Sequence, residues 1–266
     1  MIEGGRARIG IVTGVEREAA CLRAPGVDVR CSGANAAVAY ELARALIKDG
    51  ADCLLSVGLA GGLDPRLGPG AVIVANEVFA VAGETVDPMA AASLRTRLAN
   101  VFTVRGHATS LGVEAPAVEA DAAFQPAADL VERLRTVGGP KVSIGPIVGV
   151  DHVVAKRVEK LGLFTKTRAF AADMESHGVA RAASEAEVPF GVVRVVIDPS
   201  NREVPSAMIR SVRPDGSTSI GAFLAGLALN PLEIGACLSL ALDAAIAFRS
   251  LRHVGRGLAP ALLRGL

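Results

Sequence analysis

Apolar runs of strand length alternate with amphipathic stretches along most of the chain. The runs that predict strands are "ARIGIVT" (7–13), "VDVRCS" (27–32), "DCLLSVG" (52–58), "AVIVANEVFAV" (71–81), "KVSIGPIVGVDHVV" (141–154), "AFAADM" (169–174) and "PFGVVRVVID" (189–198). We expect Pro146 to break the fifth of these strands. Nearly continuous apolar strands between amphipathic helices are typical of a sheet that is covered on both faces. The pattern therefore predicts an α/β fold.

The stretches between the strands predict helices and glycine-rich turns. "ANAAVAYELARALIKDG" predicts a helix that is closed by Gly50, in the position beyond the C-cap that glycine favours. Residues 58–62 predict a glycine loop, and residues 90–139 predict helices and a surface loop. The C-terminal part predicts one or two apolar-faced helices over residues 220–252. Because we find no repeat, low-complexity tract or convincing linker, we expect a single domain over residues 1–266.

The composition narrows the classes of function. Of the 266 residues, 51% are hydrophobic, and 28 basic residues balance 27 acidic ones, so the formal net charge is only +1. Without a basic stripe we expect no nucleic-acid partner. The four cysteines form no CxxC pair and have no histidine at zinc spacing. They predict buried thiols in a reducing cytosol and no metal site.

Both ends of the chain bear on membrane association. Glu3, Arg6 and Arg8 interrupt the N-terminus before any apolar run develops, so we expect no secretory signal. Residues 217–232 lack charge, but Asn230 and Pro231 break this segment, and it is short for a spanning helix. We therefore expect a cytoplasmic protein without an integral membrane span.

Two carboxylates stand at the ends of elements that otherwise favour burial. Asp198 ends an apolar strand, and Glu175 opens a helix. Ligands of open α/β sheets bind outside the carboxyl ends of the strands, which makes Asp198 a candidate for a site. Simpler interpretations are a turn for "DPSN" and a helix cap for Glu175. Arg194 shares a strand face with Asp198, but four residues at about 3.3 Å each separate their backbones by roughly 13 Å.

Four segments together resemble the methylthioadenosine/S-adenosylhomocysteine nucleosidase branch of the purine nucleoside phosphorylase superfamily. They are "IGIVTGVEREAA", "SVGLAGGLDPRLGPGAVIVA", "GPIVGVDHVV" and "ADMESHGVARAASEAEVPFGVVRVVID", and they occur in the family's order over most of the first 200 residues. The resemblance implies a three-layer fold with a central mixed sheet and helices on both faces. It also implies an enzyme that needs no cofactor and cleaves the N-glycosidic bond of an adenine nucleoside.

The resemblance implies a role for each of a small set of residues. Asp198 would donate a proton to N7 of the purine, Glu175 would accept hydrogen bonds from the ribose hydroxyls, and Glu18 would polarise a water molecule. The apolar residues before Asp198 would raise its pKa by desolvation, as a proton donor near neutrality requires. A solvated residue in "EREAA" is the simpler interpretation of Glu18. The implied substrate-binding residues are Met174, Val153, Val154, Gly61, Ala60 and Ser32.

Some of these residues have equally simple structural interpretations. Met174 suits the core as well as a sugar contact, and the glycines of residues 58–62 suit a tight turn. His152 and His177 are more typical of a surface or of a helix cap than of catalysis. The sequence leaves each of these alternatives open.

Two departures separate this chain from the nucleosidases. Leu59 stands where they usually carry a small hydroxyl residue, and the tail after Asp198 is longer and more apolar. The segment "VRPDGSTSIGAFLAGL" resembles the hopanoid-associated phosphorylases, whose implied substrate is the lipid-linked nucleoside adenosylhopane. The resemblance to the wider family implies a homodimer or larger homo-oligomer. The apolar tail favours a core helix or a subunit interface, with peripheral contact to the inner face of the membrane as the alternative.

The attacking group and the class of function stay open at this point. Phosphate would need an anion site, for which Ser32, Gly33, Arg17 and Arg194 are candidates, whereas Glu18 favours water. A methylthioadenosine/S-adenosylhomocysteine nucleosidase, a non-catalytic nucleoside-binding module and a lipid-interaction protein are the alternative functions. A dinucleotide-dependent oxidoreductase is disfavoured, because no GxGxxG follows the first strand.

Overall fold

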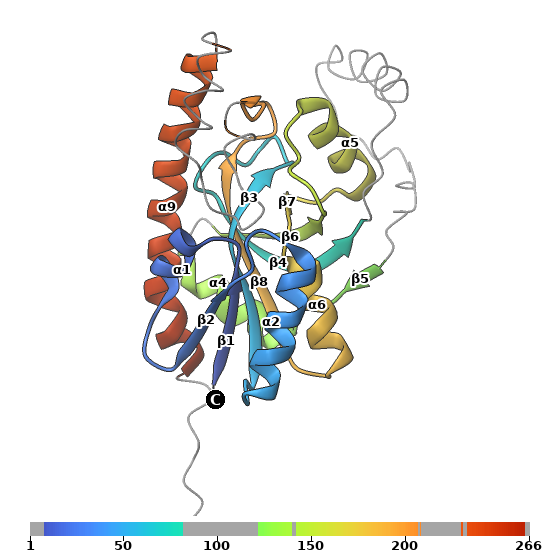
Figure 1. Cartoon of the computed structure of the whole chain (residues 1–266), viewed down its shortest axis with the longest axis vertical. Coiled ribbons are helices and arrows are strands. Elements are labelled where there is room, and N and C mark those ends of the chain that lie inside the picture. The colour runs from blue at the N-terminus through green and yellow to red at the C-terminus, as the bar shows by residue number, and fades with distance from the viewer. Residues whose placement is uncertain are drawn as a thin grey trace, which may run out of the picture.

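The computed structural model describes residues 8–81, 122–139, 142–206, 208, 230 and 233–263. Its strands are β1 (Ile9–Thr13), β2 (Val27–Cys31), β3 (Cys53–Gly62), β4 (Val72–Ala80), β5 (Ala122–Phe124), β6 (Val142–Gly149), β7 (Ala171–Asp173) and β8 (Phe190–Asp198). Its helices are α1 (Glu16–Leu22), α2 (Ala36–Lys48), α4 (Ala128–Val137), α5 (Arg157–Thr167), α6 (Ser176–Glu185) and α9 (Ile234–Leu263). Strands and helices alternate along the chain, and the predicted α/β class is confirmed (Figure 1).

The strands form one mixed sheet of eight strands in the order β2-β1-β3-β7-β6-β4-β5. Strand β8 lies off this path and joins its two arms, because it pairs parallel with β3 and antiparallel with β4. The pairs β3–β7, β7–β6, β6–β4, β4–β8 and β8–β3 therefore close a ring of five strands. An open sheet, which the strand pattern had suggested, would contain no such ring.

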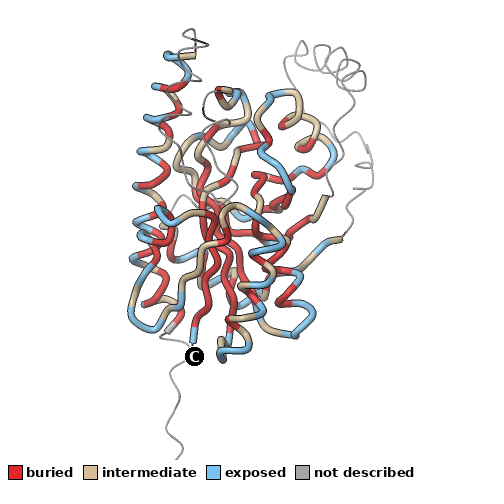
Figure 2. Tube along the Cα trace, viewed as in Figure 1, coloured by how far each residue is buried: buried red, intermediate tan, exposed pale blue. Residues whose placement is uncertain are grey.

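Helices cover the sheet on both faces because β8 is apolar on both sides. Val193 and Val195 face a cluster that includes residues of α1, α4 and α9, whereas Val192 and Val196 face a cluster built on α2 and α6. Alternating residues of a strand point to opposite faces, so a strand buried on both faces is apolar at most positions, and the buried Arg194 is the exception in the interior of β8. The central strands β1, β3, β7 and β8 are correspondingly the most buried part of the molecule (Figure 2).

The helix predicted at residues 34–50 is confirmed as α2. Asn35 caps its N-terminus by accepting a hydrogen bond from the Val38 amide, and Asp49 is its C-cap. Gly50 follows with φ of +88°, the left-handed conformation that ends many helices and that glycine adopts without a steric penalty.

Two local predictions are wrong. Residues 58–62 form no loop but continue β3, because Gly58–Ala60 pair with β8 and Gly61 and Gly62 pair with β7. Pro146 does not break its strand either, since β6 runs from Val142 to Gly149. Its partner β4 has a register shift between Ala75 and Val78, opposite the proline, so the missing N–H leaves no regular ladder bond unmade there.

The long C-terminal helix α9 takes up part of the predicted apolar tail. It packs Phe248, Leu251 and Leu258 into the cluster that covers β8, while the rest of the stretch predicted at 220–252 lies outside the described residues. Within the described part of the chain, Ile234–Leu262 is long and apolar enough to cross a membrane by length and composition. Core helices pass the same test, and the packing of α9 against the sheet is that of a core helix on one side.

Candidate active site

A cavity of about 210 Å³ lies where several strands end. It is lined by the β1–α1 turn, the second half of β3, the segment after β6, the β7–α6 turn and the end of β8. Of the residues that the sequence proposed for a site, eight line this cavity, namely Glu18, Glu175, Asp198, Met174, Val153, Val154, Ala60 and Gly61. Ser32 does not line it; its buried hydroxyl lies 3.3 Å from the Thr13 carbonyl oxygen.

A second cavity, of about 350 Å³, lies near the other ends of β1 and β2. Its charged residues are Arg8, Asp28 and Asp49, all exposed. Arg8 donates to the Asp49 carbonyl oxygen, and the carboxylates of Asp28 and Asp49 accept from Arg30. Of these two cavities, only the smaller one is lined by buried carboxyl groups. Chemistry therefore favours the smaller cavity over the larger one as the functional site.

Glu18 is held at the cavity by neutral donors. Its Oε2 accepts hydrogen bonds from the Thr13 hydroxyl at 2.8 Å and from the Gly14 and Val15 amides at 2.9 Å. Its Oε1 accepts one from the Leu59 amide at 2.8 Å. The side chain is 5% exposed, so the interpretation of Glu18 as a solvated residue is wrong. It occupies the third position of α1, where a glutamate can bond the backbone of the cap residue.

Two glycines make room for this carboxylate. A Cβ atom at Gly14 would lie 2.7 Å from Oε1 of Glu175 and 3.2 Å from Oε2 of Glu18. A Cβ atom at Gly58 would lie 3.1 Å from Oε1 of Glu18. The glycine-rich sequence of β3 thus serves close packing of the strand against a buried carboxylate, not a turn.

Glu175 stands at the N-cap position of α6 but caps nothing with its side chain. The capping interactions belong to Asp173, whose carboxylate accepts from the Ser176 amide at 3.1 Å and from the Ser176 hydroxyl at 2.5 Å. The interpretation of Glu175 as a helix cap is therefore wrong. Its Oε2 instead faces the guanidinium group of Arg194, whose Nη2 lies 3.2 Å away.

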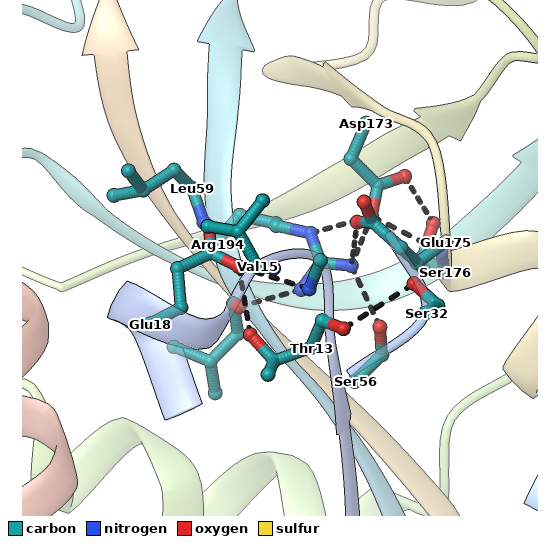
Figure 3. A network of polar contacts seen from close by, with 12 residues as sticks. Thr13, Val15, Glu18, Ser32, Ser56, Leu59, Asp173, Glu175, Ser176 and Arg194 are labelled. Carbon is teal, nitrogen blue, oxygen red and sulfur yellow. Dashed lines mark hydrogen bonds and ion pairs between the residues drawn. The ribbon is translucent and has the colours of Figure 1, made fainter. Parts of the chain in front are cut away.

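Arg194 is the buried centre of a polar network (Figure 3). It donates to Asp173 and Glu175, to the Ser56 hydroxyl at 2.6 Å and to the Val193 carbonyl at 3.2 Å. One cation thus serves two buried carboxylates. Burial raises the pKa of Glu175 to about 8, opposed by Arg194 and reinforced by the negative charges of Asp173 and Glu18.

Asp198 lies outside the Arg194 network and pairs with a residue that the sequence did not single out. The Lys160 ammonium group donates to Oδ2 of Asp198, so the two side chains form an ion pair that is almost fully buried. Burial raises the pKa of Asp198 to about 6, although Lys160 acts to lower it. The direction is the one that the apolar end of β8 predicts.

The remaining polar candidates have partners away from the reacting groups. Nε2 of His152 lies 2.5 Å from Oε1 of Glu159, and Nε2 of His177 lies 3.3 Å from Oδ1 of Asp151. Arg17 stacks over the Phe248 ring, 4.3 Å from its centre. Since the donors of Arg194 serve the buried network, neither arginine proposed for phosphate binding faces the cavity as a free cation. No group of three or more metal-ligating side chains occurs among residues that the structure describes.

Comparisons with known proteins agree with the fold. Among protein families, residues 3–228 match the phosphorylase superfamily. A search of the curated proteins finds no match to the sequence. Among solved structures, the chain is similar to the 5′-methylthioadenosine/S-adenosylhomocysteine nucleosidase of Helicobacter pylori, with 16% identity, a TM-score of 0.61 and coverage of 97% of this chain and 98% of that one.

Two further solved structures show the same likeness. The futalosine hydrolase of Helicobacter pylori has 17% identity and a TM-score of 0.62, over 98% of this chain and 99% of that one. The S-adenosylhomocysteine nucleosidase of Streptococcus pyogenes has 20% identity and a TM-score of 0.55, over 74% and 86%. At these identities the likeness establishes a shared fold over nearly the whole chain.

Proposed function

The chain belongs to the phosphorylase superfamily and is an enzyme of the nucleoside phosphorylase and nucleosidase type, and from this premise we propose that it releases adenine from an adenine nucleoside. The observation that carries the proposal is Asp198, a buried carboxyl group with a pKa raised to about 6 that opens on the same cavity as Glu175 and Glu18. A non-catalytic binding module would have little use for a desolvated acid beside two further carboxyl groups.

Asp198 is the proposed acid. Breaking the bond between C1′ of the ribose and N9 of the purine sends the bonding electron pair into the base. A proton from Asp198 to N7 neutralises that charge and makes adenine a better leaving group. An acid with a pKa near the working pH is effective in this role, because it is protonated often enough and still releases its proton readily.

Glu175 is the proposed partner of the ribose. Its pKa of about 8 indicates that the free site holds this carboxyl group largely neutral at pH 7. Release of this proton to solvent gives a carboxylate that accepts hydrogen bonds from the ribose hydroxyls. The positive charge that grows on the ribosyl group favours this ionised form, so the attraction is stronger in the transition state than in the ground state. Met174, which also lines the cavity and packs against the apolar cluster that includes Val150, is the proposed apolar contact of the sugar.

Val153 and Val154 are the proposed contacts of the purine. Both line the cavity in the segment after β6, and Ala60 and Gly61 line it from β3. Gly61 lies opposite Asp198 in the β3–β8 pairing, after a register shift at Ala60. Because Gly61 has no side chain, the backbone of β3 at this point can approach a flat purine base next to Asp198.

Water is the proposed attacking group, with Glu18 as its base. Oε2 of Glu18 already accepts three hydrogen bonds, whereas Oε1 accepts one from Leu59 and retains a free lone-pair position. A water molecule on Oε1 would give its proton to Glu18 and its oxygen to C1′. Phosphate is the second candidate, because the superfamily includes phosphorylases, and it would form a ribose 1-phosphate ester in place of the free sugar.

The deciding experiment is mass spectrometry of the products formed from adenosine, 5′-methylthioadenosine and adenosylhopane, each with and without phosphate. We expect adenine in phosphate-free buffer, and 18O from labelled water in the sugar product. Adenine that appears only with phosphate, together with a ribose 1-phosphate ester, would refute the role of Glu18 in water activation. Stable nucleosides under all conditions would refute the proposed function itself.

Adenosylhopane is the substrate that we favour among these nucleosides, with methylthioadenosine and S-adenosylhomocysteine as alternatives. The segment that resembles the hopanoid-associated phosphorylases lies outside the described residues, so the support comes from its sequence and from the adjoining helix. Large apolar side chains at four-residue spacing are exposed on the first half of α9, namely Ile234, Leu238, Leu242 and Ile246. A substrate with a triterpenoid group resides in a bilayer, which gives such a surface a purpose.

We propose that this face of α9 rests on a bilayer that contains anionic lipids. Beyond Ile246 the exposed residues of the same helix turn basic, with Arg249, Arg252 and Arg256. The exposed apolar side chains of this helix suit contact with acyl chains, and its exposed arginines suit contact with anionic headgroups. Flotation with vesicles of phosphatidylglycerol and phosphatidylcholine should carry the protein upward, and Leu238→Glu/Leu242→Glu should abolish this.

The same double variant separates the bilayer from a second copy of the chain. We expect a homodimer or larger homo-oligomer, as the resemblance implies. If Leu238→Glu/Leu242→Glu dissociates the oligomer in light scattering, and the wild type never floats with vesicles, this face is a subunit interface. Flotation of the wild type with an unchanged oligomeric state in the variant would support the bilayer.

A further inference from the structure

Lys160 is a fully buried lysine in the first turn of α5. Lysine is almost never fully buried unless its charge is paired. Its Nζ donates to Oδ2 of Asp198, to the Pro199 carbonyl oxygen at 3.1 Å and to the Arg202 carbonyl oxygen at 3.0 Å. The three acceptors match the three N–H bonds of an ammonium group, so the site is built for the charged form of Lys160.

We propose that Lys160 is the positioning residue of Asp198: by occupying Oδ2, it leaves Oδ1 as the oxygen that carries the transferable proton. A carboxyl group has one acidic proton and two oxygens, and an oxygen that accepts from an ammonium group is a poor place for it. Both carboxylate oxygens lie near Gly61, which lines the cavity: a Cβ atom there would lie 3.6 Å from Oδ1 and 3.7 Å from Oδ2. The bond from Lys160 to Oδ2 is therefore what distinguishes the two oxygens. The inference rests on the proposed role of Asp198 as the acid.

The position of Lys160 also sets the strength of the acid. Burial among apolar residues disfavours the ionised form of Asp198, and the ammonium group opposes this effect, so the pKa is about 6. Asp243 of α9 acts in the same direction as burial. Without Lys160 the carboxyl group would be protonated over a wider pH range, but each protonated molecule would be a weaker donor.

The other charged groups near Asp198 have fixed partners. Arg202 pairs through its guanidinium group with Asp243, so its charge is turned to α9 and only its carbonyl oxygen meets Lys160. The titratable residues that line the cavity with Asp198 are Glu18, Asp173, Glu175 and His152. Among residues that the structure describes, Lys160 is the one cation within hydrogen-bonding distance of Asp198.

A purely structural role is the competing explanation. The two carbonyl oxygens belong to the segment that follows β8, so Lys160 also ties this segment to α5. Loss of that tie would lower stability and would slow the reaction at every pH. It would not move the pH at which Asp198 titrates, and this difference makes the two explanations separable.

The test compares Lys160→Met, Lys160→Gln and Lys160→Arg with the wild type. The first readout is the 13C chemical shift of the Asp198 carboxyl carbon against pH, assigned through its loss in Asp198→Asn. We expect the titration midpoint to rise by about 1 to 3 pH units in the Met and Gln variants, which lack the positive charge. Lys160→Arg should stay near the wild type, because arginine keeps the charge and donors. Lys166→Met, at an exposed position of α5, is the matched control.

The second readout is the pH profile of kcat/KM for adenine release from adenosine. Activity that requires protonated Asp198 falls as the pH rises through its pKa, so the Met and Gln variants should show this fall at a higher pH and a lower plateau. An unmoved NMR midpoint in a folded Met or Gln variant would overturn the inference. If the Met variant does not fold, the Gln variant, which keeps an amide donor, decides the matter.

The two readouts also distinguish this inference from the proposed function. If no variant and no wild-type protein releases adenine, but the NMR midpoint still moves as expected, the proposed function fails and the pairing of Lys160 with Asp198 stands. If adenine is released normally and the midpoint does not move, the proposed function stands and the inference about Lys160 fails.

Discussion

The carboxyl groups of the cavity are compensated in two different ways. On the Glu18 and Glu175 side, backbone amides and the Thr13 hydroxyl hold Glu18, and Glu175 shares the guanidinium group of Arg194 with Asp173. On the Asp198 side, one ammonium group holds one carboxyl group in an ion pair. The comparison shows that burial alone does not assign a role, since the ratio of cations to carboxyl groups differs between the two sides.

This difference has a direct chemical meaning. Arg194 serves both Asp173 and Glu175, so the network carries one more negative group than it has cations, and the protonated form of Glu175 is favoured. A positive charge that grows on a ribosyl group nearby would balance the additional carboxylate. Asp198 has its own cation, so its pKa stays closer to neutrality despite nearly complete burial. The network side suits an emerging cation, and the ion-pair side suits proton transfer.

The largest effect is expected from Asp198→Asn, which removes the acid but keeps the shape of the side chain. We expect kcat/KM for adenine release to fall by about 100- to 10,000-fold, the usual contribution of general acid catalysis. Steady-state kinetics with adenosine measures the loss. Asp64→Asn changes a buried aspartate that pairs with Arg66 away from the cavity, and it should keep the wild-type rate. Near-normal turnover of Asp198→Asn would remove it from the acid role.

The next effect concerns the stability of the network side. Arg194→Met leaves Asp173 and Glu175 buried without a cation, and breaking a buried pair in this way costs about 3 to 5 kcal/mol of unfolding free energy. Urea denaturation followed by circular dichroism measures the change. Arg181→Met removes an exposed arginine from α6 and should leave the stability nearly unchanged. Equal stability of both variants would contradict the role of Arg194 in stabilising the two buried carboxyl groups.

A smaller effect is expected from Gly14→Ala, which tests how tightly the two glutamates meet. The added methyl group would lie 2.7 Å from Oε1 of Glu175, and overpacking of this kind costs about 1 to 3 kcal/mol. We expect lower stability in urea and a lower kcat/KM. Gly68→Ala is the matched control, because no heavy atom lies within 4 Å of the position that its Cβ would take. Indistinguishable variants would mean that Glu175 moves aside without cost.

The smallest effect is a change in the pH dependence of the melting temperature. Because the folded-state pKa of Glu175 is raised from 4.5 to about 8, the folded protein binds more protons than the unfolded chain between these values, and its stability falls as the pH rises. Glu175→Gln should lose this component, so its melting temperature relative to the wild type should rise by a few °C between pH 6 and 8.

The interval from pH 6 to 8 isolates Glu175, because the corresponding contribution of Asp198 ends near its own pKa of about 6. Glu41→Gln, an exposed change on α2, serves as the control and should follow the wild type. Parallel curves for Glu175→Gln and the wild type would contradict the raised pKa of this carboxyl group.

Much of the fold follows from local pattern, and its exceptions have physical causes. The apolar strands and the helix closed by Gly50 depend on residues that are close together in the sequence, so they could be predicted. The extension of β3 through residues 58–62 could not, because glycine disfavours strands and the pairing with β7 and β8 comes from distant sequence. Closure of the ring by β8 is a similar long-range property.

The site shows the same division. Glu18, Glu175 and Asp198 could be singled out by their segments and by their places at the ends of elements. Ser32 follows a strand end as well, yet its hydroxyl turns to the Thr13 carbonyl. Lys160 had no signal, since a lysine after a glutamate in a helix resembles a surface residue, and its partner lies 38 positions later. Arg194 was considered against Asp198 on its own strand and as a phosphate ligand, whereas its side-chain partners lie on β7, on β3 and at the N-cap of α6.

The inner position of β8 has a consequence for how the molecule opens. Hydrogen-bonded on both edges, this strand can be expected to release its amide protons to solvent only when the whole sheet comes apart, whereas outer parts such as β2 and β5 can fray separately. Product escape must then rely on the segments around the cavity while the backbone that carries Asp198 stays still. Deuterium uptake should accordingly be slowest at Val192–Val196 and unaffected there by a bound nucleoside, except through the global unfolding equilibrium.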